Sequence, residues 1–205
     1  MVAFPISKLP KGEQRELLDN LNYLNTAEIR SFCKQHSIPY AITIETKDGG
    51  KRRTKDDDRK GVMLKRIRHF LQTGVILGET CFRATVVSFD PFPEKLTAAD
   101  RLYYGQYDKA NRTMLALLKD LTGGRFRNGA LARILARDFW TKGEAPTFEE
   151  YASAWLQAFK EHTKPNPEWA YLSDRASNTA ISGWKKLRAS KASRVMKTLN
   201  RITGR

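Results

Sequence analysis

The sequence predicts a mainly α-helical protein, with an N-terminal helix–extended loop–helix module, a C-terminal helical domain and room for one short β-hairpin. Apolar residues recur at helical spacing over most of the chain. Capping boxes stand before two of these stretches. Residues 75–110 are the least helical part, and CFRATVVSF within them has the β-branched and aromatic content that is typical of a strand.

The N-terminal segment, residues 1–19, is expected to be an arm that leads into the start of a helix. Pro5 and Pro10 interrupt this arm, because proline restricts the backbone and removes a hydrogen-bond donor. A helix is then predicted over residues 12–21. Its apolar residues are Leu17, Leu18 and Leu21.

Two short amphipathic helices follow. The first, over residues 26–36, starts after Asn25, a good N-cap, and has Glu28 at the third helical position of a capping box. Pro39 disfavours its continuation. The second helix is predicted over residues 60–72. Their apolar faces, which we expect to pack together, carry Ile29, Phe32 and Cys33 in the first helix and Met63, Ile67, Phe70 and Leu71 in the second.

The segment between these helices, residues 40–59, has no apolar pattern after Ile44, so we expect an exposed and mobile loop. Asp48-Gly49 is a typical turn pair, which favours a small hairpin within this loop. Beyond the second helix, residues 75–98 are predicted to be a linker that includes the strand candidate.

The C-terminal helical domain is predicted over residues 99–184. Asn128 is the expected cap of one helix, and Thr147 opens a second capping box with Glu150. TKPNPE, residues 163–168, is the expected loop after the last of these helices. The helices are predicted over residues 109–121 and 129–140 and from residue 147 onward. The residues expected in their shared core are Leu118, Leu131, Leu135 and Trp155.

The last segment, residues 185–205, carries eight Lys or Arg and no acidic residue. Basic tails of this composition are often loosely ordered arms that bind nucleic acid. We therefore expect a tail that adds charge contacts to a polyanion without fixing its orientation.

The charge balance indicates the class of partner. The chain of 205 residues has 37 Lys and Arg against 22 Asp and Glu, a net charge of +15. Such an excess attracts polyanions, and nucleic acid is the most common one. Two cysteines do not make a disulfide framework. We also expect no secretory signal and no membrane span, and we expect a cytoplasmic protein, associated with the nucleoid if bacterial.

The helix pair, within residues 20–74, resembles the SAP domain, a helix–extended loop–helix module generally associated with DNA binding. LNTAEIRSFCKQHSIP and KGVMLKRI carry the resemblance, which implies that Lys60 contacts a DNA phosphate. The sequence departs from the family where Ser37 replaces a frequent Gly, and where the stretch of 20 residues between Pro39 and Lys60 is longer than usual. The residues that fit the family pattern are Leu24, Thr26, Glu28, Ile29, Cys33, Ile38, Pro39, Lys60, Met63, Leu64, Arg66 and Ile67.

The segment NRTMLALLKDLTGGRFRNGALARILARDFWTKGEAPTFEEYASAWLQAF resembles a helical domain of unknown function that follows SAP-like modules in bacterial proteins. A helix that ends before a Gly-containing aromatic turn, and a later helix with a Trp, carry this likeness. It implies no known activity.

We therefore predict a DNA-binding protein that contacts the phosphate backbone of mainly double-stranded DNA with little sequence specificity. Residues 47–69 hold ten Lys or Arg against four Asp, which favours a phosphate clamp around the second helix start, although a solvated charged loop has the same composition. The predicted nucleic-acid contacts are Arg52, Arg53, Lys55, Arg59, Lys60, Lys65, Arg66, Lys185, Lys186 and Arg188.

Two other function classes stay open: an RNA-binding or ribosome-associated protein, and a metal-dependent nuclease or DNA-processing enzyme. The sequence has no Walker-type loop, nucleophile elbow or zinc signature, so we expect neither an enzyme nor a cofactor. The acidic run Asp56–Asp58 lacks calcium-loop spacing, and one of its members is the expected helix cap. Scattered acids that a nuclease would need are Asp90, Glu94, Asp100 and Asp108. Aromatic side chains can stack on bases, but at helical spacing they are more often core residues. Both readings apply to Trp140, Trp155, Trp169, Trp184, Tyr103, Tyr104 and Tyr107.

Overall fold

The computed structural model describes residues 4–108, 110–161 and 181–204, with the backbone alone for residues 181–185. The chain divides into two compact units. Unit 1 comprises residues 1–40, 57–79 and 165–205, and unit 2 comprises residues 41–56 and 80–164. The predicted boundaries at residues 74 and 98 differ from this division, because the segment between the paired helices belongs to unit 2.

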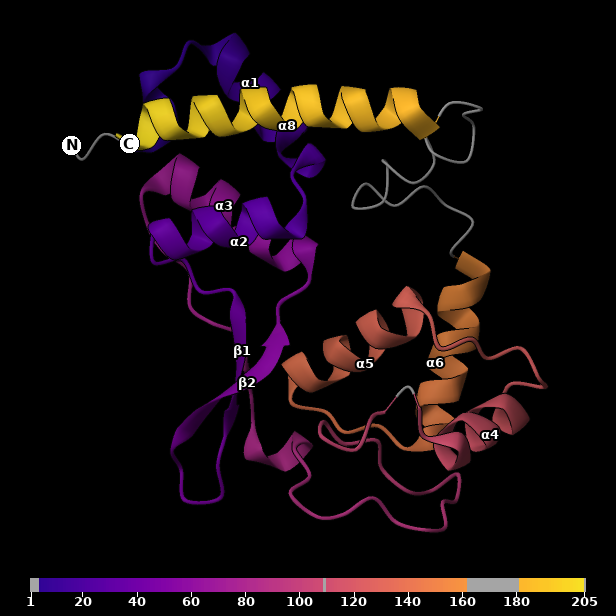
Figure 1. Cartoon of the computed structure of the whole chain (residues 1–205). Coiled ribbons are helices and arrows are strands. Elements are labelled where there is room, and N and C mark those ends of the chain that lie inside the picture. The colour runs from indigo at the N-terminus through magenta and orange to yellow at the C-terminus, as the bar shows by residue number, and fades with distance from the viewer. Residues whose placement is uncertain (1–3, 109, 162–180, 205) are drawn as a thin grey trace. The chain divides into compact units, whose positions relative to one another are not determined.

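Unit 1 is helical (Figure 1). The elements among its described residues are the 3₁₀ helices η1 (Pro5–Lys8) and η2 (Leu21–Tyr23) and the α-helices α1 (Lys11–Asn20), α2 (Thr26–Gln35), α3 (Lys60–Thr73) and α8 (Ile181–Thr203). Helix α8 packs on α1, η1 and η2, and α2 packs on α3. Their shared core includes Leu21, Leu24, Ile29, Phe32, Met63, Ile67, Leu71, Val195, Leu199 and Ile202.

The predicted α2–α3 pair is confirmed. The N-cap Asn25 accepts from the Glu28 amide at 2.8 Å, and the Glu28 carboxylate accepts from the Asn25 amide at 2.6 Å, so both halves of the capping box are present. Gly74 ends α3 in the left-handed conformation, with φ of 73°. The predicted contact residues Ile29, Phe32, Met63 and Ile67 are all fully buried.

Both ends of the chain contradict the prediction of an arm and a loose tail. At the N-terminal end, Ile6 and Leu9 are buried in the core of unit 1. At the C-terminal end, a continuous helix replaces the tail. Among its basic residues, this helix has an apolar stripe at intervals of three and four residues. The residues of the stripe lie in the same core: Ala192, Val195, Leu199 and Ile202.

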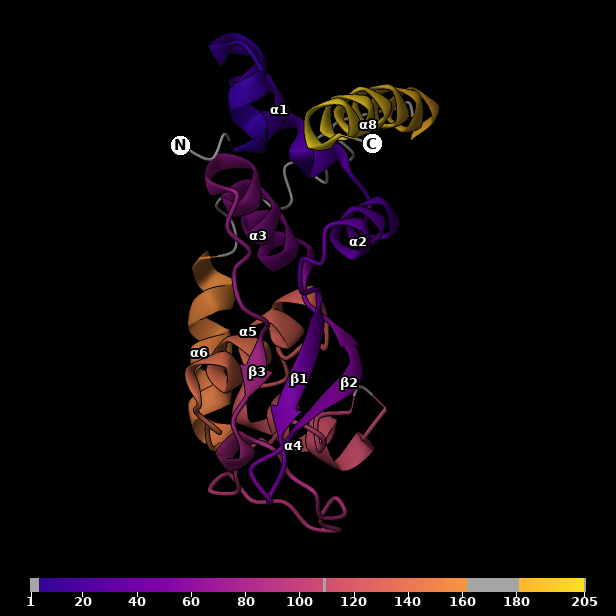
Figure 2. The ribbon, with the colours of Figure 1, turned by 90° about the vertical axis from the view of Figure 1, so that its left-hand side faces the viewer.

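In its described residues, unit 2 combines a small sheet with three α-helices and one 3₁₀ helix (Figures 1 and 2). The strands are β1 (Ala41–Glu45), β2 (Lys51–Asp57) and β3 (Cys81–Phe82), and the helices are η3 (Ala84–Val86), α4 (Arg112–Leu121), α5 (Ala130–Lys142) and α6 (Phe148–Glu161). Strand β1 lies between β2 and β3 and runs parallel to β3, with Thr43 opposite Cys81. Figure 2 shows this order directly.

The predicted loop at residues 40–59 is a hairpin. The Thr46 amide donates to the Gly50 carbonyl at 2.9 Å, and Gly49 lies at the tip with φ of 81°, as the Asp48-Gly49 pair favours. The expectation of exposure was wrong for β1, where Ile42 and Ile44 are buried. The reason is the pairing with β3, which places one strand of the hairpin in the core of unit 2.

The helical part of unit 2 confirms some predicted core positions and changes others. Leu118 and Trp155 are buried, whereas Leu131 and Leu135 are half-buried. The capping box of Thr147 with Glu150 is present. Gly129, not Asn128, is the N-cap of α5. The residues of α5 that enter the core are Ala132, Ala136 and Trp140. The predicted loop at 163–168 lies outside the described residues.

Candidate nucleic-acid interface

The excess of positive charge is unequal between the two units. Unit 1 has 19 Lys and Arg against nine Asp and Glu, and unit 2 has 18 against 13. Two thirds of the net charge therefore lies in unit 1, which is also the part with the predicted DNA-binding helix pair.

Four cations of unit 1 surround the short turn Asn22–Asn25, and we call them the turn cluster: Lys60, Arg68, Arg188 and Lys191. From α3, the Lys60 ammonium donates to the Asn22 carbonyl at 2.5 Å and the Arg68 Nη2 donates to the Asn22 side-chain oxygen at 3.2 Å. From α8, the Arg188 Nη1 donates to the Tyr23 carbonyl at 3.2 Å. Lys191 donates to the Tyr23 hydroxyl at 3.0 Å and lies 4.3 Å from the centre of that ring.

Like charges in this cluster oppose one another. Burial, and then the positive charge of Arg188, lower the pKa of Lys60 from 10.5 to about 8, while Glu28 acts in the opposite direction. Glu28 forms an ion pair with Arg188 at 3.1 Å and also caps α2. A cavity of about 150 Å³ opens beside Lys60 and Arg188, against the first residues of α2. The cluster is thus an electropositive site that a bound anion would relieve.

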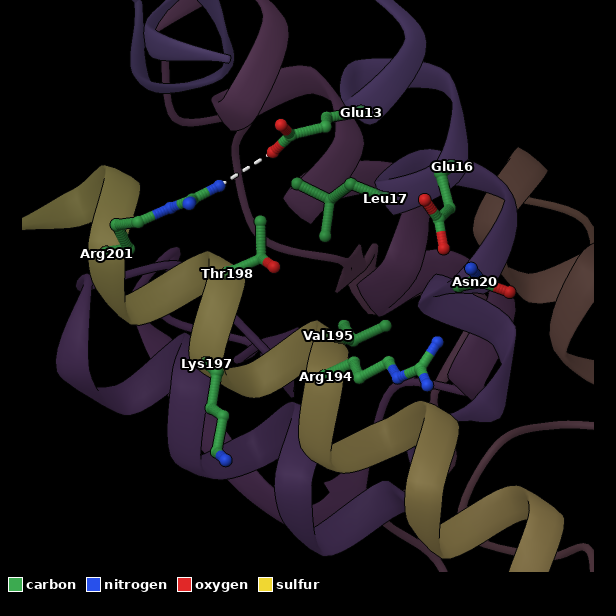
Figure 3. Close-up of a pocket in the computed structure, with 9 residues that line it drawn as sticks. All are labelled: Glu13, Glu16, Leu17, Asn20, Arg194, Val195, Lys197, Thr198 and Arg201. Carbon is green, nitrogen blue, oxygen red and sulfur yellow. Dashed lines mark hydrogen bonds and ion pairs between the residues drawn. The ribbon is translucent and has the colours of Figure 1, made fainter. Parts of the chain in front are cut away.

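Helix α8 adds an exposed basic face. Lys186, Arg194 and Lys197 are exposed on it. Arg194 and Lys197 border a groove of about 400 Å³ between α1 and α8, with Leu17 and Val195 at its apolar base (Figure 3).

One acid of α1 pairs with a cation of α8 along this groove. Arg201 forms an ion pair with Glu13 at 2.7 Å. Figure 3 shows Lys197 directed away from Glu13 and Glu16, whereas Arg194 extends toward the side on which Glu16 and Asn20 lie. Lys197 and Lys186 are therefore the cations of α8 that are best placed to meet an external polyanion.

Arg66 is not a surface cation, which contradicts its predicted role as a nucleic-acid contact. Its side chain is 6% exposed and pairs with Asp58, itself 4% exposed, at 2.5 Å. Its guanidinium also donates to the Gly78 carbonyl at 2.9 Å and the Pro39 carbonyl at 3.1 Å. Arg66 therefore connects three parts of unit 1: the chain before the hairpin at Pro39, the chain after it at Asp58, and the segment that follows α3 at Gly78.

The predicted clamp is divided between the units. Exposed Arg52, Arg53 and Lys55 lie on β2 in unit 2. In unit 1, Arg59 is the half-buried N-cap residue of α3, and Lys65 is exposed on the same helix. Lys60 and Arg188, which are far apart in the sequence, come together in the turn cluster, whereas the side chain of Lys185 lies outside the described residues.

The sequence prediction omitted Arg68 and Lys191. Both carried a signal in their spacing. Arg68 follows Lys60 by eight residues, about two helical turns, so the two share a face of α3. Lys191 follows Arg188 by three, which places them together on α8, but only if the tail is a helix.

The three consecutive aspartates have three different partners. Asp56 accepts from the Tyr104 hydroxyl at 2.8 Å, Asp57 pairs with Arg30 at 2.9 Å, and Asp58 pairs with Arg66. The predicted helix cap among them is wrong, because Arg59 occupies the N-cap position of α3. Within the described ranges, no group of three His, Cys, Asp or Glu side chains is arranged to hold a metal ion, so the scattered acids that a nuclease would need form no such cluster there.

Two further observations bear on the class of protein. Burial raises the pKa of the Cys33 thiol to about 11, so Cys33 is a core residue and a poor nucleophile at neutral pH. Among the helices described, none has the length and apolar character needed to cross a membrane.

Comparisons of the chain with protein-family models, with curated proteins and with solved structures find no match. The SAP-like resemblance therefore stays a prediction.

Proposed function

We propose that unit 1 binds the phosphate backbone of nucleic acid, with duplex DNA as the main partner, through the turn cluster and the exposed face of α8. The observation that carries this proposal is the turn cluster, where four cations from two helices gather around one short turn. Their mutual repulsion opposes folding and is relieved by phosphate, because each contact replaces a counterion and stabilises the charged form.

The cluster retains donors for such a ligand. The contacts of Arg68 and Arg188 described above use one nitrogen of each guanidinium, and a guanidinium carries five N–H donors in a planar fork that matches phosphate. The fork of an arginine can therefore hold the turn and a phosphate oxygen together.

A rigid helix favours a regular polyanion. Helix α8 has 23 residues, about 35 Å in length, and carries seven Lys or Arg without an acidic residue. Cations that are fixed along such a helix need phosphates at fixed positions, which a double helix presents and a flexible strand does not. Because these contacts go to phosphate rather than to base edges, the binding should have little sequence specificity.

The test compares two double variants that remove the same charge. Arg68→Gln with Lys191→Gln removes two members of the turn cluster, and Arg112→Gln with Lys119→Gln removes two exposed cations of α4 in unit 2. Binding to a labelled duplex is measured by fluorescence anisotropy between about 50 and 200 mM salt. We expect the cluster variant to lower the salt slope of log K by about 2, and the α4 control to leave it unchanged.

Three outcomes would change the proposal. An unchanged slope and affinity in a folded cluster variant would show that the turn cluster does not contact DNA. Stronger competition by structured RNA than by duplex DNA would identify RNA as the partner. Metal-dependent cleavage of the labelled strand would place the protein among nucleases instead.

A further inference from the structure

Unit 2 contains a second site that the backbone-binding proposal does not use. A cavity of about 450 Å³ opens between β2, the Tyr104–Asp108 segment and α5. Pockets for small ligands begin at about 300 Å³, so this cavity has room for a ligand of the size of a mononucleotide. Aromatic rings and arginines together line it.

The aromatic walls of this cavity are held in place. Tyr104 and Tyr107 both meet the Trp140 ring edge to face, at centroid distances of 5.4 and 6.1 Å and at interplanar angles of 76°. The Trp140 indole donates to the Leu102 carbonyl at 2.9 Å, and the Tyr107 hydroxyl donates to Asn128 at 2.9 Å. Trp140 itself is 3% exposed, so the half-buried tyrosines are the rings that a ligand can reach. Fixed rings of this kind offer a stacking surface without an ordering cost.

The charged groups that line this cavity give it a net positive charge. Arg133 and Arg137 stand one turn apart on α5, and Lys55 comes from β2. Asp56 accepts from the Tyr104 hydroxyl at 2.8 Å and lies 3.8 Å from Arg137, which offsets one of the three cations. With Asp108 also present, three cations face two carboxylates.

This balance decides between two kinds of aromatic-lined site. A cage for an alkylammonium group needs a negative or neutral surround, because the ligand is a cation. The cavity of unit 2 has the opposite sign, with exposed Arg133 and Lys55 at its border. Burial also raises the pKa of Tyr104 to about 12, so this phenol stays neutral and does not add negative charge.

We propose that this cavity binds a nucleotide, with the base against Tyr104 and Tyr107 and the phosphate toward Arg133 and Lys55. The shared chemistry, a planar base joined to a phosphate, has two possible sources: a free mononucleotide, or an unpaired nucleotide of single-stranded DNA or RNA. The proposal is independent of duplex binding by unit 1, since no residue of the turn cluster lines this cavity.

The test uses the full chain with adenosine monophosphate and with a short single-stranded oligonucleotide, each titrated by calorimetry. We expect Arg133→Ala to weaken binding about 10-fold, which is the effect of losing a charge-assisted hydrogen bond. Arg112→Ala, the matched control, removes an exposed arginine of α4 and should leave binding unchanged. Because Arg133 is exposed, its truncation should not alter the thermal melt.

A second pair of variants separates stacking from hydrogen bonding. Tyr107→Leu removes the ring and should weaken binding by about 10-fold or more, whereas Tyr107→Phe keeps the ring and should retain most of the affinity. Saturable binding of the mononucleotide identifies the free ligand, and binding of the oligonucleotide alone identifies a strand.

The proposal would be overturned if neither probe binds, or if Arg133→Ala and Tyr107→Leu bind as the wild type does. Equal affinity for adenosine and its monophosphate would show that the cavity does not bind the phosphate group. None of these results changes the salt slope on duplex DNA, so failure of this site and failure of the turn cluster are distinguishable.

Discussion

Replacement of Arg66 by methionine should unfold or nearly unfold unit 1 without acting through nucleic acid. The substitution removes the Arg66 guanidinium, which forms an ion pair with the Asp58 carboxylate, a group that is only 4% exposed. Removal of one member of a buried ion pair costs about 3–5 kcal/mol. The carbonyls of Gly78 and Pro39 also lose a donor, and each unsatisfied buried acceptor adds about 1–3 kcal/mol. These contributions overlap, yet together they approach the roughly 5–15 kcal/mol that holds a typical protein folded.

The assay is urea denaturation followed by circular dichroism. Lys65→Met is the matched control, because Lys65 is the exposed neighbour of Arg66 on α3, and its replacement should change the free energy of unfolding by less than about 0.5 kcal/mol. Asp58→Leu with Arg66→Met removes both charges and should recover about 3 kcal/mol relative to Arg66→Met alone, since no buried charge is left unpaired.

One result would refute this account of Arg66. If Arg66→Met keeps the unfolding midpoint of the wild type and lowers the salt slope of DNA binding, then Arg66 is accessible and contacts phosphate. An equal loss of stability in the single and double variants would also contradict it, because the two charges would then be uncoupled.

Two further predictions concern unit 1. Because the pKa of Lys60 lies at about 8 when folded and 10.5 ordinarily, its charged form opposes folding below pH 8, and this penalty declines as the pH rises from 8 toward 10.5. A bound phosphate raises the pKa of Lys60, so duplex affinity should fall as the pH rises through 8. Lys60→Arg, whose guanidinium stays protonated, should abolish this pH dependence in anisotropy titrations. The same pH profile in both proteins would exclude a phosphate contact at Lys60. Leu199→Ala in α8 should lower the free energy of unfolding by about 2–5 kcal/mol, because Leu199 is fully buried, whereas an unchanged urea midpoint would show that α8 is not part of the folded core.

Local signals in the sequence predicted many of the elements well. The capping boxes of α2 and α6 and the Asp48-Gly49 turn each depend on a few neighbouring residues, and each is present in the structure. Trp155 was placed in the core from its helical spacing, and it is buried. The basic cluster of unit 1 was predicted in part, through Lys60 and Arg188.

The errors arose where a residue's role depends on distant partners. Arg66 has the same local context as its exposed neighbour Lys65, and only the position of Asp58 and of two carbonyls makes it a buried structural residue. Asn128 is a good cap by type, yet its side chain bonds to Tyr107 while Gly129 starts α5. Composition cannot show these choices, because they result from contacts between segments that are far apart in the chain.

The sequence alone determined the helical character of the protein, its strongly positive charge and the starts of its main helices, since propensity, capping and charge act over a few residues. Tertiary structure decided that the basic C-terminal segment is a core helix, because its apolar stripe is stable only against α1 and η2. It also decided that the segment between α2 and α3 joins a sheet, because the side of β1 that faces away from β2 needs backbone partners. The chain from Thr80 into β3 supplies them, and the Thr43 amide donates to the Thr80 carbonyl at 2.9 Å. The turn cluster and the aromatic cavity of unit 2 have the same origin: each combines side chains that only folding brings together.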